Sequence, residues 1–182
     1  MKIIEKFLSV GKKARGLNGS PVFFSKPINL TLLHWIGPWP NHTPTGVRNW
    51  WENGSNGEGV QASAHFIIKD ENILQTLPLN EVGWHSGDAR NQNSIGIEVI
   101  PMNLTGEFSR QTIESLKELI QHIRKETGKD LTLERHYDGT QKKDCPRYYT
   151  PVTSMVGVEG RASNPDGGDQ RWEALKQFLN AA

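Results

Sequence analysis

The stretch Ser94-Ile-Gly-Ile-Glu-Val-Ile100 decides the fold class, because it has the pattern of a strand and a long amphipathic segment follows it. Its apolar residues at positions 95, 97 and 99 recur with the period of two that is typical of β-strands. Farther along, Ser109 can cap a helix that ends at Gly128 and has one apolar face. That face carries Ile113, Leu116, Leu119, Ile120 and Ile123. We expect it to lie on a sheet.

Segments on both sides of this stretch complete the pattern. The runs Leu30–His34, Ala64–Ile68 and Leu131–His136 are β-prone and predict three more strands. A short helix is expected between Thr45, as its N-cap, and Gly54. Apolar residues at helical spacing predict a C-terminal helix over 170–180. The predicted fold class is therefore α/β, with a mixed central β-sheet flanked by helices.

The composition indicates a single globular domain. The chain has 182 residues, of which 35% are hydrophobic and 23% charged, and this is sufficient for one packed core. We expect one domain over 1–182 that acts as a monomer. The segment 151–169 is rich in Gly, Ser, Asn and Pro and predicts an irregular loop.

Charge and hydrophobicity exclude several classes of partner. Lys and Arg number 21 against 20 Asp and Glu, so no large basic surface is available for nucleic acid. No apolar run approaches the roughly 18 to 20 residues that cross a bilayer, so we expect no membrane insertion. The apolar N-terminal segment is interrupted by Glu5 and Lys6 and lacks a small-residue cleavage site, which predicts that there is no signal peptide. The single cysteine, Cys145, cannot form an internal disulfide.

Three residues of metal-binding type stand at or just after the ends of predicted strands. His34 ends the first run, His136 ends the last, and Cys145 follows nine residues later. Zinc accepts imidazole nitrogen at about 2.0 to 2.1 Å and thiolate at about 2.3 Å, and catalytic sites keep three protein ligands. Taken singly, a histidine is more often structural and a lone cysteine more often fills the core. Together the three form a candidate zinc site.

Five ordered motifs resemble those of a known family, the zinc-dependent N-acetylmuramoyl-L-alanine amidases. This family includes phage endolysins, bacterial autolysins, a cytoplasmic muropeptide-recycling amidase and the peptidoglycan recognition proteins. The resemblance covers 30–148 and implies the amidase type 2, or peptidoglycan recognition protein-like, fold. The motifs are Leu32-Leu-His34, Ala62-Ser-Ala-His-Phe-Ile-Ile68, Gly83-Trp-His-Ser-Gly87, Asn93-Ser-Ile-Gly-Ile-Glu98, and Arg135-His-Tyr-Asp138 followed by Lys143-Asp-Cys-Pro146.

The resemblance implies a single Zn²⁺ bound by His34, His136 and Cys145. Relatives use either cysteine or aspartate as the third ligand, so Asp144 is the alternative to its neighbour. Cys145 stands directly before Pro146 and fits the motif better.

The resemblance also assigns catalytic roles that the residues alone do not. A glutamate in a strand is more often at a sheet edge or in a salt bridge, and a lysine in a polar turn is usually exposed. In this family Glu98 looks like the general base that takes a proton from the attacking water, and Lys143 would stabilise the tetrahedral oxygen. Some relatives carry a catalytic tyrosine where this chain has Ala64, so a tyrosine mechanism is excluded.

Three residues are candidates for substrate binding: His65, His85 and Trp39. His65 begins a predicted strand, and His85 lies in a glycine-flanked loop where a substrate can approach closely. An exposed Trp39 would offer an aromatic face to a sugar ring. The alternatives are structural hydrogen bonds for the histidines and core packing for the tryptophan.

The implied function is zinc-dependent hydrolysis of the amide between N-acetylmuramic acid and L-alanine in peptidoglycan, as in an endolysin or autolysin. Made in the cytoplasm without a signal peptide, such an enzyme would need a membrane-permeabilising partner to reach the wall. The alternatives are a recycling amidase for soluble anhydro-muropeptides and a non-catalytic peptidoglycan-binding protein. A purely structural zinc site would need a fourth ligand, and no Cys or metal-spaced His follows Cys145.

Overall fold

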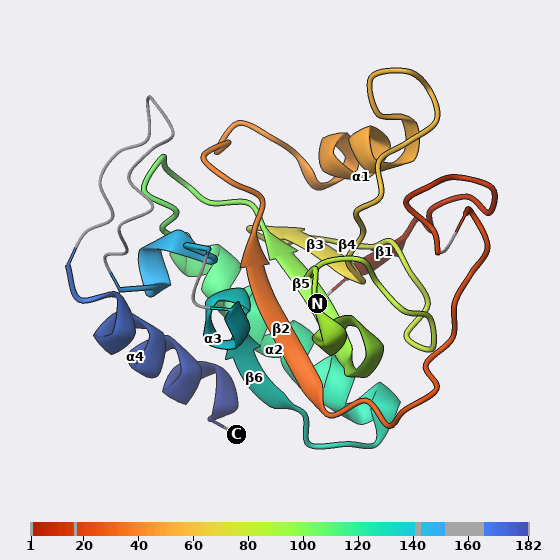
Figure 1. Cartoon of the computed structure of the whole chain (residues 1–182). Helices are drawn as coiled ribbons and strands as arrows, with labels where there is room; N and C mark the ends of the chain where they lie inside the picture. Colours follow the sequence, from red (N-terminus) through yellow and green to blue (C-terminus); the bar gives the residue numbers. More distant parts are fainter. Residues whose placement is uncertain (1, 17, 141–142, 152–165, 182) are drawn as a thin grey trace.

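The computed structural model describes residues 2–16, 18–140, 143–151 and 166–181. Its centre is one six-stranded sheet with helices packed around it (Figure 1). Neighbouring strands are parallel except for the hairpin of β3 and β4. This mixed sheet confirms the predicted fold class. In spatial order the strands are β1 (Ile3–Glu5), β4 (Asn72–Gln75), β3 (Phe66–Lys69), β5 (Ser94–Val99), β2 (Leu30–Trp35) and β6 (Thr132–Arg135).

Two hydrophobic clusters cover the two faces of the sheet, because side chains alternate along each strand. Phe66 belongs to the larger cluster, which also contains residues of helices α2 (Arg110–Thr127) and α4 (Gly168–Asn180). Its neighbour Ile67 belongs to the smaller cluster, which contains residues of helix α1 (Pro44–Asn53). Both faces of the central strands are thus buried, as is usual for parallel strands.

The long helix agrees closely with its sequence pattern. The Ser109 hydroxyl caps α2 by accepting a hydrogen bond from the backbone N–H of Thr112. Gly128 ends the helix in the left-handed region, with φ of 65°. Of the five apolar residues expected on its inner face, four are buried and Ile113 is partly buried against the core. The predicted helix and its contact with the sheet are confirmed.

The N-cap predicted for the first helix is wrong by two residues. Thr43, and not Thr45, is the N-cap of α1, and its hydroxyl accepts a hydrogen bond from the backbone N–H of Gly46. Pro44 then occupies the first helical position, where its fixed φ and missing N–H cost nothing. Gly54 ends the helix as predicted.

Several other boundaries differ from the expected ones. The last strand ends at Arg135, because His136 begins the short helix α3 (His136–Thr140). Two 3₁₀-helices, η1 (Ala89–Asn93) and η2 (Arg147–Tyr149), follow loops that carry site residues. Of the expected loop 151–169, residues 152–165 lie outside the described residues, and its end is already helical in α4.

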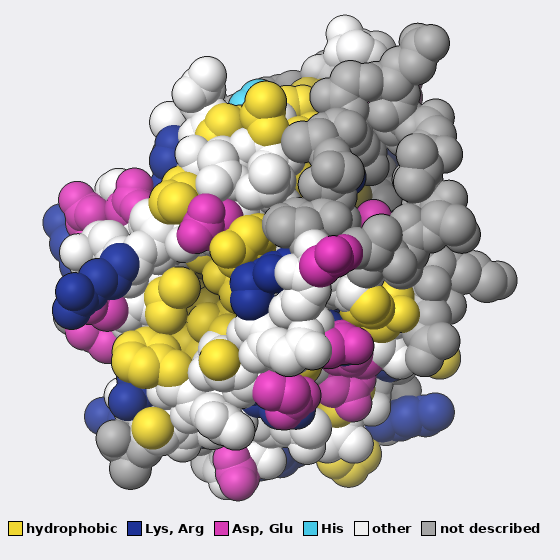
Figure 2. Space-filling model, turned by 90° about the vertical axis from the view of Figure 1, so that its left-hand side faces the viewer, with side chains coloured by type: hydrophobic (Ala, Val, Ile, Leu, Met, Phe, Trp, Pro, Cys, Tyr) yellow, Lys and Arg dark blue, Asp and Glu magenta, His cyan; other side chains and the backbone are white. Residues whose placement is uncertain are grey.

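The surface on the side of α4 mixes side chains of all kinds. Figure 2 shows hydrophobic side chains gathered near the middle of this face, with acidic and basic side chains on several sides of them. No charge of one sign dominates the face, in keeping with a formal net charge of +1. Within the described ranges, no helix has the length and hydrophobicity needed to cross a membrane.

Candidate metal centre and catalytic site

The sheet brings the candidate residues to one edge. Strand β2 lies between β5 and β6 and is parallel to both, so the carboxyl ends of all three strands meet. His34 is the next-to-last residue of β2, and its register partner on β5 is Glu98. His136 follows the last residue of β6 and begins α3, which packs against β2 and β6. The backbone N–H of Tyr137 then donates to the carbonyl of Cys145 at 2.9 Å, which brings the cysteine back to the site.

Three ligand atoms converge at this point. Nδ1 of His34 lies 3.1 Å from Nδ1 of His136 and 3.7 Å from Sγ of Cys145. The three residues offer ligand atoms that all lie within 4.8 Å of one another, and each residue is buried. Among the described residues, no further His, Cys, Asp or Glu joins this cluster.

These separations fit one tetrahedral ion. With bond lengths of about 2.0 to 2.3 Å to imidazole and thiolate, ligand atoms on a tetrahedral zinc lie roughly 3.2 to 3.7 Å apart. The two distances from His34 Nδ1, 3.1 Å to His136 and 3.7 Å to Cys145, fall at or near this range, and the third pair of ligand atoms lies within 4.8 Å. A zinc ion bound by these three residues alone would keep a fourth position for water or substrate, as catalytic zinc sites do. The cluster therefore has the donor set and spacing of a metal centre.

Burial controls the protonation of the three residues. Desolvation lowers the pKa of His34 well below its usual value and that of His136 to about 4, so both rings are neutral at pH 7. Neutral imidazole is the form that binds a metal. Desolvation and, next, the charge of Glu98 raise the pKa of the Cys145 thiol. Metal binding must therefore displace the thiol proton, as is general for cysteine ligands.

Glu98 lies beside this cluster in an environment that favours its protonated form. One carboxylate oxygen, Oε2, is shielded from solvent and has no hydrogen-bond partner among the described residues. Burial raises the pKa of Glu98 to about 8, an effect that the nearby charge of Lys143 partly offsets. A carboxylate with a pKa near neutrality can both accept and return a proton at physiological pH.

Lys143 presents an exposed side chain close to the cluster. Its positive charge lowers the pKa of His34, His136 and Glu98 alike, which places it within electrostatic reach of all three. Its backbone carbonyl accepts a hydrogen bond from the N–H of Cys145 at 2.8 Å, so the lysine and the cysteine share one tight turn.

A pocket of about 650 Å³ opens next to Glu98 and runs along α1. Trp39 and Trp50 are about half exposed on its walls, with 51% and 57% of their surface accessible. Trp35 and Trp51 also line it but are buried. The remaining lining residues are Ile36, Asn41, His42, Thr43, Gly46 and Val47. An apolar, aromatic groove therefore leads to the carboxylate.

His65 and His85 are neighbours of the site but not residues of this pocket. His65 is fully buried; its Nε2 donates to the carbonyl of Glu81 at 2.8 Å and its Nδ1 accepts from the N–H of Gly96 at 3.1 Å. Both ring nitrogens are thus used by the backbone. His85 instead contacts His34, with 3.0 Å between His85 Nδ1 and His34 Nε2.

The buried His65 predicts a pH dependence of stability. Burial lowers the pKa of His65 from 6.5 to about 4, so between these values the unfolded state binds more protons than the folded one. Stability therefore falls as the pH is lowered from 6.5 to 4, by about 3 kcal/mol for this residue. Urea unfolding of metal-free protein at pH 7.5 and pH 4 measures it. In His65→Asn the pH-dependent loss should be smaller by about this amount; an equal loss in both proteins would refute the assignment.

One residue near the metal centre was not identified from the sequence. Arg90 donates from Nη2 to the carbonyl of His136 at 2.9 Å and from Nη1 to that of Arg135 at 3.3 Å. Asp88 holds the guanidinium at 2.9 Å, and Gly139 leaves room for it, since a Cβ there would lie 2.0 Å from Arg90 Cζ. An isolated arginine in a short 3₁₀-helix gives no sequence signal for such a role.

Comparison with known proteins agrees with this geometry. A family model described as N-acetylmuramoyl-L-alanine amidase matches residues 24–148. The chain is 29% identical over 150 residues to N-acetylmuramoyl-L-alanine amidase XlyA of Bacillus subtilis (strain 168). The matched segment covers 81% of this chain and 47% of XlyA. It is 37% identical over 89 residues to CwlH of the same strain, covering 47% of this chain and 35% of CwlH. The chain thus spans less than half the length of these two curated relatives.

Solved structures share the fold over nearly the whole chain. The catalytic domain of XlyA superposes with a TM-score of 0.70 at 23% identity, covering 99% of this chain and 100% of that one. A mutant endolysin from Bacillus subtilis gives 0.69 at 25% identity, covering 98% and 99% of the two chains. PlyL gives 0.71 at 17% identity, covering 100% and 98%. Because the family model spans well over half of the chain and includes the clustered His34, His136 and Cys145, this chain belongs to the N-acetylmuramoyl-L-alanine amidase family.

Proposed function

We propose that this protein is a zinc-dependent amidase that hydrolyses the bond between N-acetylmuramic acid and L-alanine in peptidoglycan. The observation that carries the proposal is the cluster of His34, His136 and Cys145 with a neighbouring carboxylate, Glu98, that lies at the end of an open groove. Family membership supplies the reaction class and the substrate.

Different residues have different roles in the proposed hydrolysis: metal binding, proton transfer and stabilisation of charge. His34, His136 and Cys145 would hold the zinc ion, which when bound would supply Lewis-acid chemistry for the scissile carbonyl and the attacking water. The Glu98 carboxylate accepts the proton of that water and passes it to the departing alanine nitrogen, so the alanine leaves as a neutral amine and not as an amide anion. The Lys143 ammonium would stabilise the negative charge on the tetrahedral oxygen, a role supported by its electrostatic effect on the pKa of the neighbouring Glu98.

The role of Lys143 predicts a loss of turnover without a loss of metal. Lys143→Met keeps a similar side-chain length but removes the charge, so kcat should fall by about 10²- to 10³-fold. Zinc content should stay at the wild-type level, because Lys143 is not among the clustered ligands. The matched control is Lys117→Met on α2, for which we expect wild-type kcat. An unchanged kcat for Lys143→Met would remove the residue from the mechanism.

Trp39 is the proposed substrate contact, because it is half exposed in the groove that ends at Glu98. Its ring can cover the apolar face of a sugar or of a peptide side chain. For Trp39→Ala we expect kcat/KM to fall about tenfold, since one aromatic contact contributes on the order of 1.4 kcal/mol. The loss should be in KM, with kcat nearly unchanged. Steady-state kinetics on solubilised wall fragments separate the two parameters, and a fall in kcat alone would contradict the proposed contact.

We further propose a lytic role, in which the enzyme degrades intact cell wall as an endolysin or autolysin does. Solved structures that share this fold include proteins described as endolysins. The sequence alternatives, a recycling amidase and a non-catalytic wall-binding protein, would share the fold. The retained ligand set with its adjacent carboxylate supports an enzyme over a binding protein.

Digestion of purified cell walls tests the proposal. The protein should release new amino groups without new reducing sugar ends, a chelator should stop the release, and added zinc should restore it. Soluble anhydro-muropeptides should be poorer substrates than intact walls. Wall binding without release of amino groups would refute the enzyme and favour a binding protein. A preference for the soluble fragments would favour the recycling role.

A further inference from the structure

We propose that His85 is a positioning residue of the metal centre, which fixes the orientation and the tautomer of the ligand His34. This inference rests on the proposed metal site. It gives His85 a role different from the substrate contact expected from the sequence. The residue acts through a hydrogen bond to His34 and not on the reacting atoms.

The first argument is the direction of the two nitrogens of His34. Nδ1 of His34 faces the other two ligands, at 3.1 Å from His136 Nδ1 and 3.7 Å from Cys145 Sγ. The opposite nitrogen, Nε2, lies 3.0 Å from Nδ1 of His85. A neutral imidazole that binds metal through one nitrogen carries its proton on the other. His34 Nε2 is therefore the donor, and His85 Nδ1 is the acceptor.

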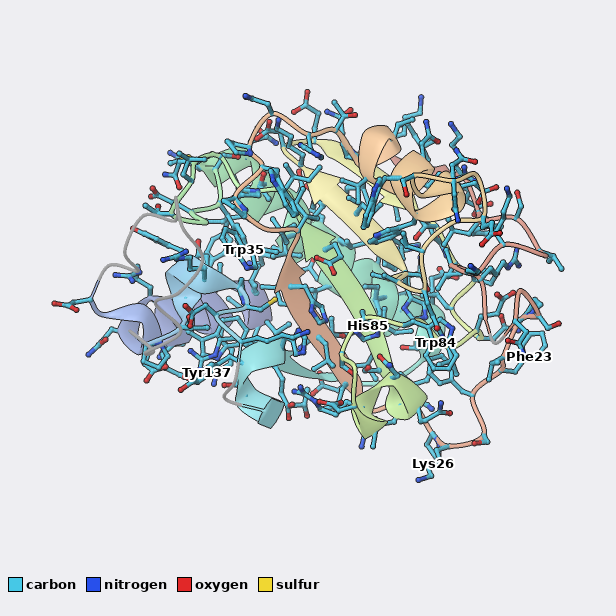
Figure 3. All side chains as sticks on the ribbon, turned by 45° about the horizontal axis from the view of Figure 1, so that its top comes forward. Phe23, Lys26, Trp35, Trp84, His85 and Tyr137 are labelled. Atoms are coloured by element: carbon cyan, nitrogen blue, oxygen red, sulfur yellow. The ribbon has the colours of Figure 1, made fainter. Side chains whose placement is uncertain are left out.

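The second argument is that two glycines leave the space that the His85 ring occupies. The backbone of β5 passes directly beneath it, and a Cβ on Gly96 would lie 2.5 Å from His85 Cδ2. A Cβ on Gly83 would likewise lie only 3.0 Å from the same atom. Figure 3 shows His85 lying over the sheet beside β5. Two positions without side chains thus form the space for this ring.

The loop that carries His85 is fixed by hydrogen bonds to Asn91. The buried Oδ1 of Asn91 accepts hydrogen bonds from the backbone N–H groups of His85 and Ser86, at 3.1 and 2.9 Å. The Ser86 hydroxyl donates to the same oxygen at 2.9 Å. The backbone of His85 is therefore fixed independently of its ring. Such support is typical of residues that orient a metal ligand.

The third argument is that His85 is poorly placed to touch a substrate. Its remaining ring nitrogen, Nε2, is shielded from solvent. Its side chain is absent from the lining of the groove beside Glu98, which is formed by residues of β2, β5 and the α1 region. A ring with one nitrogen bonded to His34 and the other shielded from solvent is suited to position His34 and not to bind a substrate.

Zinc affinity of three variants tests the inference. Competition with a chromogenic chelator at pH 7.5 gives the zinc Kd without reference to activity. For His85→Leu, which fills the space but accepts no hydrogen bond, we expect affinity to fall about 10- to 100-fold. His85→Asn can place Oδ1 where Nδ1 now lies, so it should stay within about threefold of wild type. His122→Asn, on α2, is the control and should bind as wild type.

Gly96→Ala gives a second test that keeps the histidine in place. Its methyl group would displace the His85 ring, so zinc affinity should fall. In a His85→Ala background the ring is gone, and the same glycine change should cause no further loss. This comparison remains valid if the His85→Leu variant does not fold, and near-UV circular dichroism of the metal-free proteins checks folding.

The outcomes separate this inference from the proposed function. Wild-type affinity in His85→Leu, or equal losses in the Asn and Leu variants, would overturn the positioning role while leaving the metal site intact. A raised KM with unchanged zinc affinity would also overturn it and would restore a substrate role. If the wild-type protein itself binds no zinc, the proposed metal site fails instead.

Discussion

Glu98→Gln is expected to lower kcat by about 10²- to 10⁴-fold, the range of general acid–base catalysis. Glutamine keeps the size of the side chain but cannot accept the proton of the attacking water. Burial already raises the pKa of Glu98 to about 8, so the carboxylate exchanges protons near neutral pH. The measurement is kcat on solubilised cell-wall fragments, together with the zinc content of each protein.

The control for this variant is Glu114→Gln, which changes a partly exposed carboxylate on α2 that is paired with Arg110. It should retain the wild-type kcat. A Glu98→Gln protein with more than about a tenth of wild-type kcat would show that Glu98 is not the general base. A normal kcat per bound zinc, with less zinc bound, would assign Glu98 to the metal centre instead.

Cys145→Ser is expected to abolish activity through loss of metal. A serine hydroxyl remains protonated near neutral pH and is a poor substitute for thiolate as a zinc ligand. Zinc affinity should fall by more than about 100-fold, beyond the loss that outer-shell changes cause. The folded state should survive in the metal-free form, because the substitution replaces one sulfur atom by oxygen. Metal analysis after dialysis and the chelator assay measure the loss.

Asp144→Asn is the matched comparison, because relatives divide between cysteine and aspartate as third ligand. Only Cys145 joins the cluster with His34 and His136. Asp144→Asn should therefore keep wild-type zinc affinity. The reverse pattern, with tight binding in Cys145→Ser and weak binding in Asp144→Asn, would assign the third ligand to the aspartate.

Much of the fold could be predicted, because a long regular pattern of apolar residues is compatible with only one type of secondary structure. The 18-residue helix α2 has both caps and a regular apolar face, and β5 alternates over six residues. By contrast, β1 and β4 were missed. β1 has three residues and borders charged ones, and β4 is four residues long after a tight turn at Asp70, whose φ is 52°. Such strands are specified by their neighbours in the sheet and not by their own sequence.

The sequence predicts those site residues that lie at the ends of strands. His34 and His136 had to meet, because their strands are adjacent and parallel. The direction in which a ring points has no such signal. His65 begins a strand and His85 lies between two glycines, yet neither position shows that one ring bonds to the backbone of Gly96 and Glu81 and the other to His34. That difference depends on the packing of β5 beneath the rings, which no local pattern encodes.

The most direct test of the proposed reaction is digestion of purified walls in H₂¹⁸O, followed by mass spectrometry of the released sugars and peptides. We expect stem peptides with a free L-alanine amino group and N-acetylmuramic acid with one ¹⁸O in its lactyl carboxylate. Both products should disappear when zinc is removed and return when it is added. Label in a peptide carboxylate, new reducing sugar ends, or peptides that stay attached to the glycan would contradict the amidase assignment.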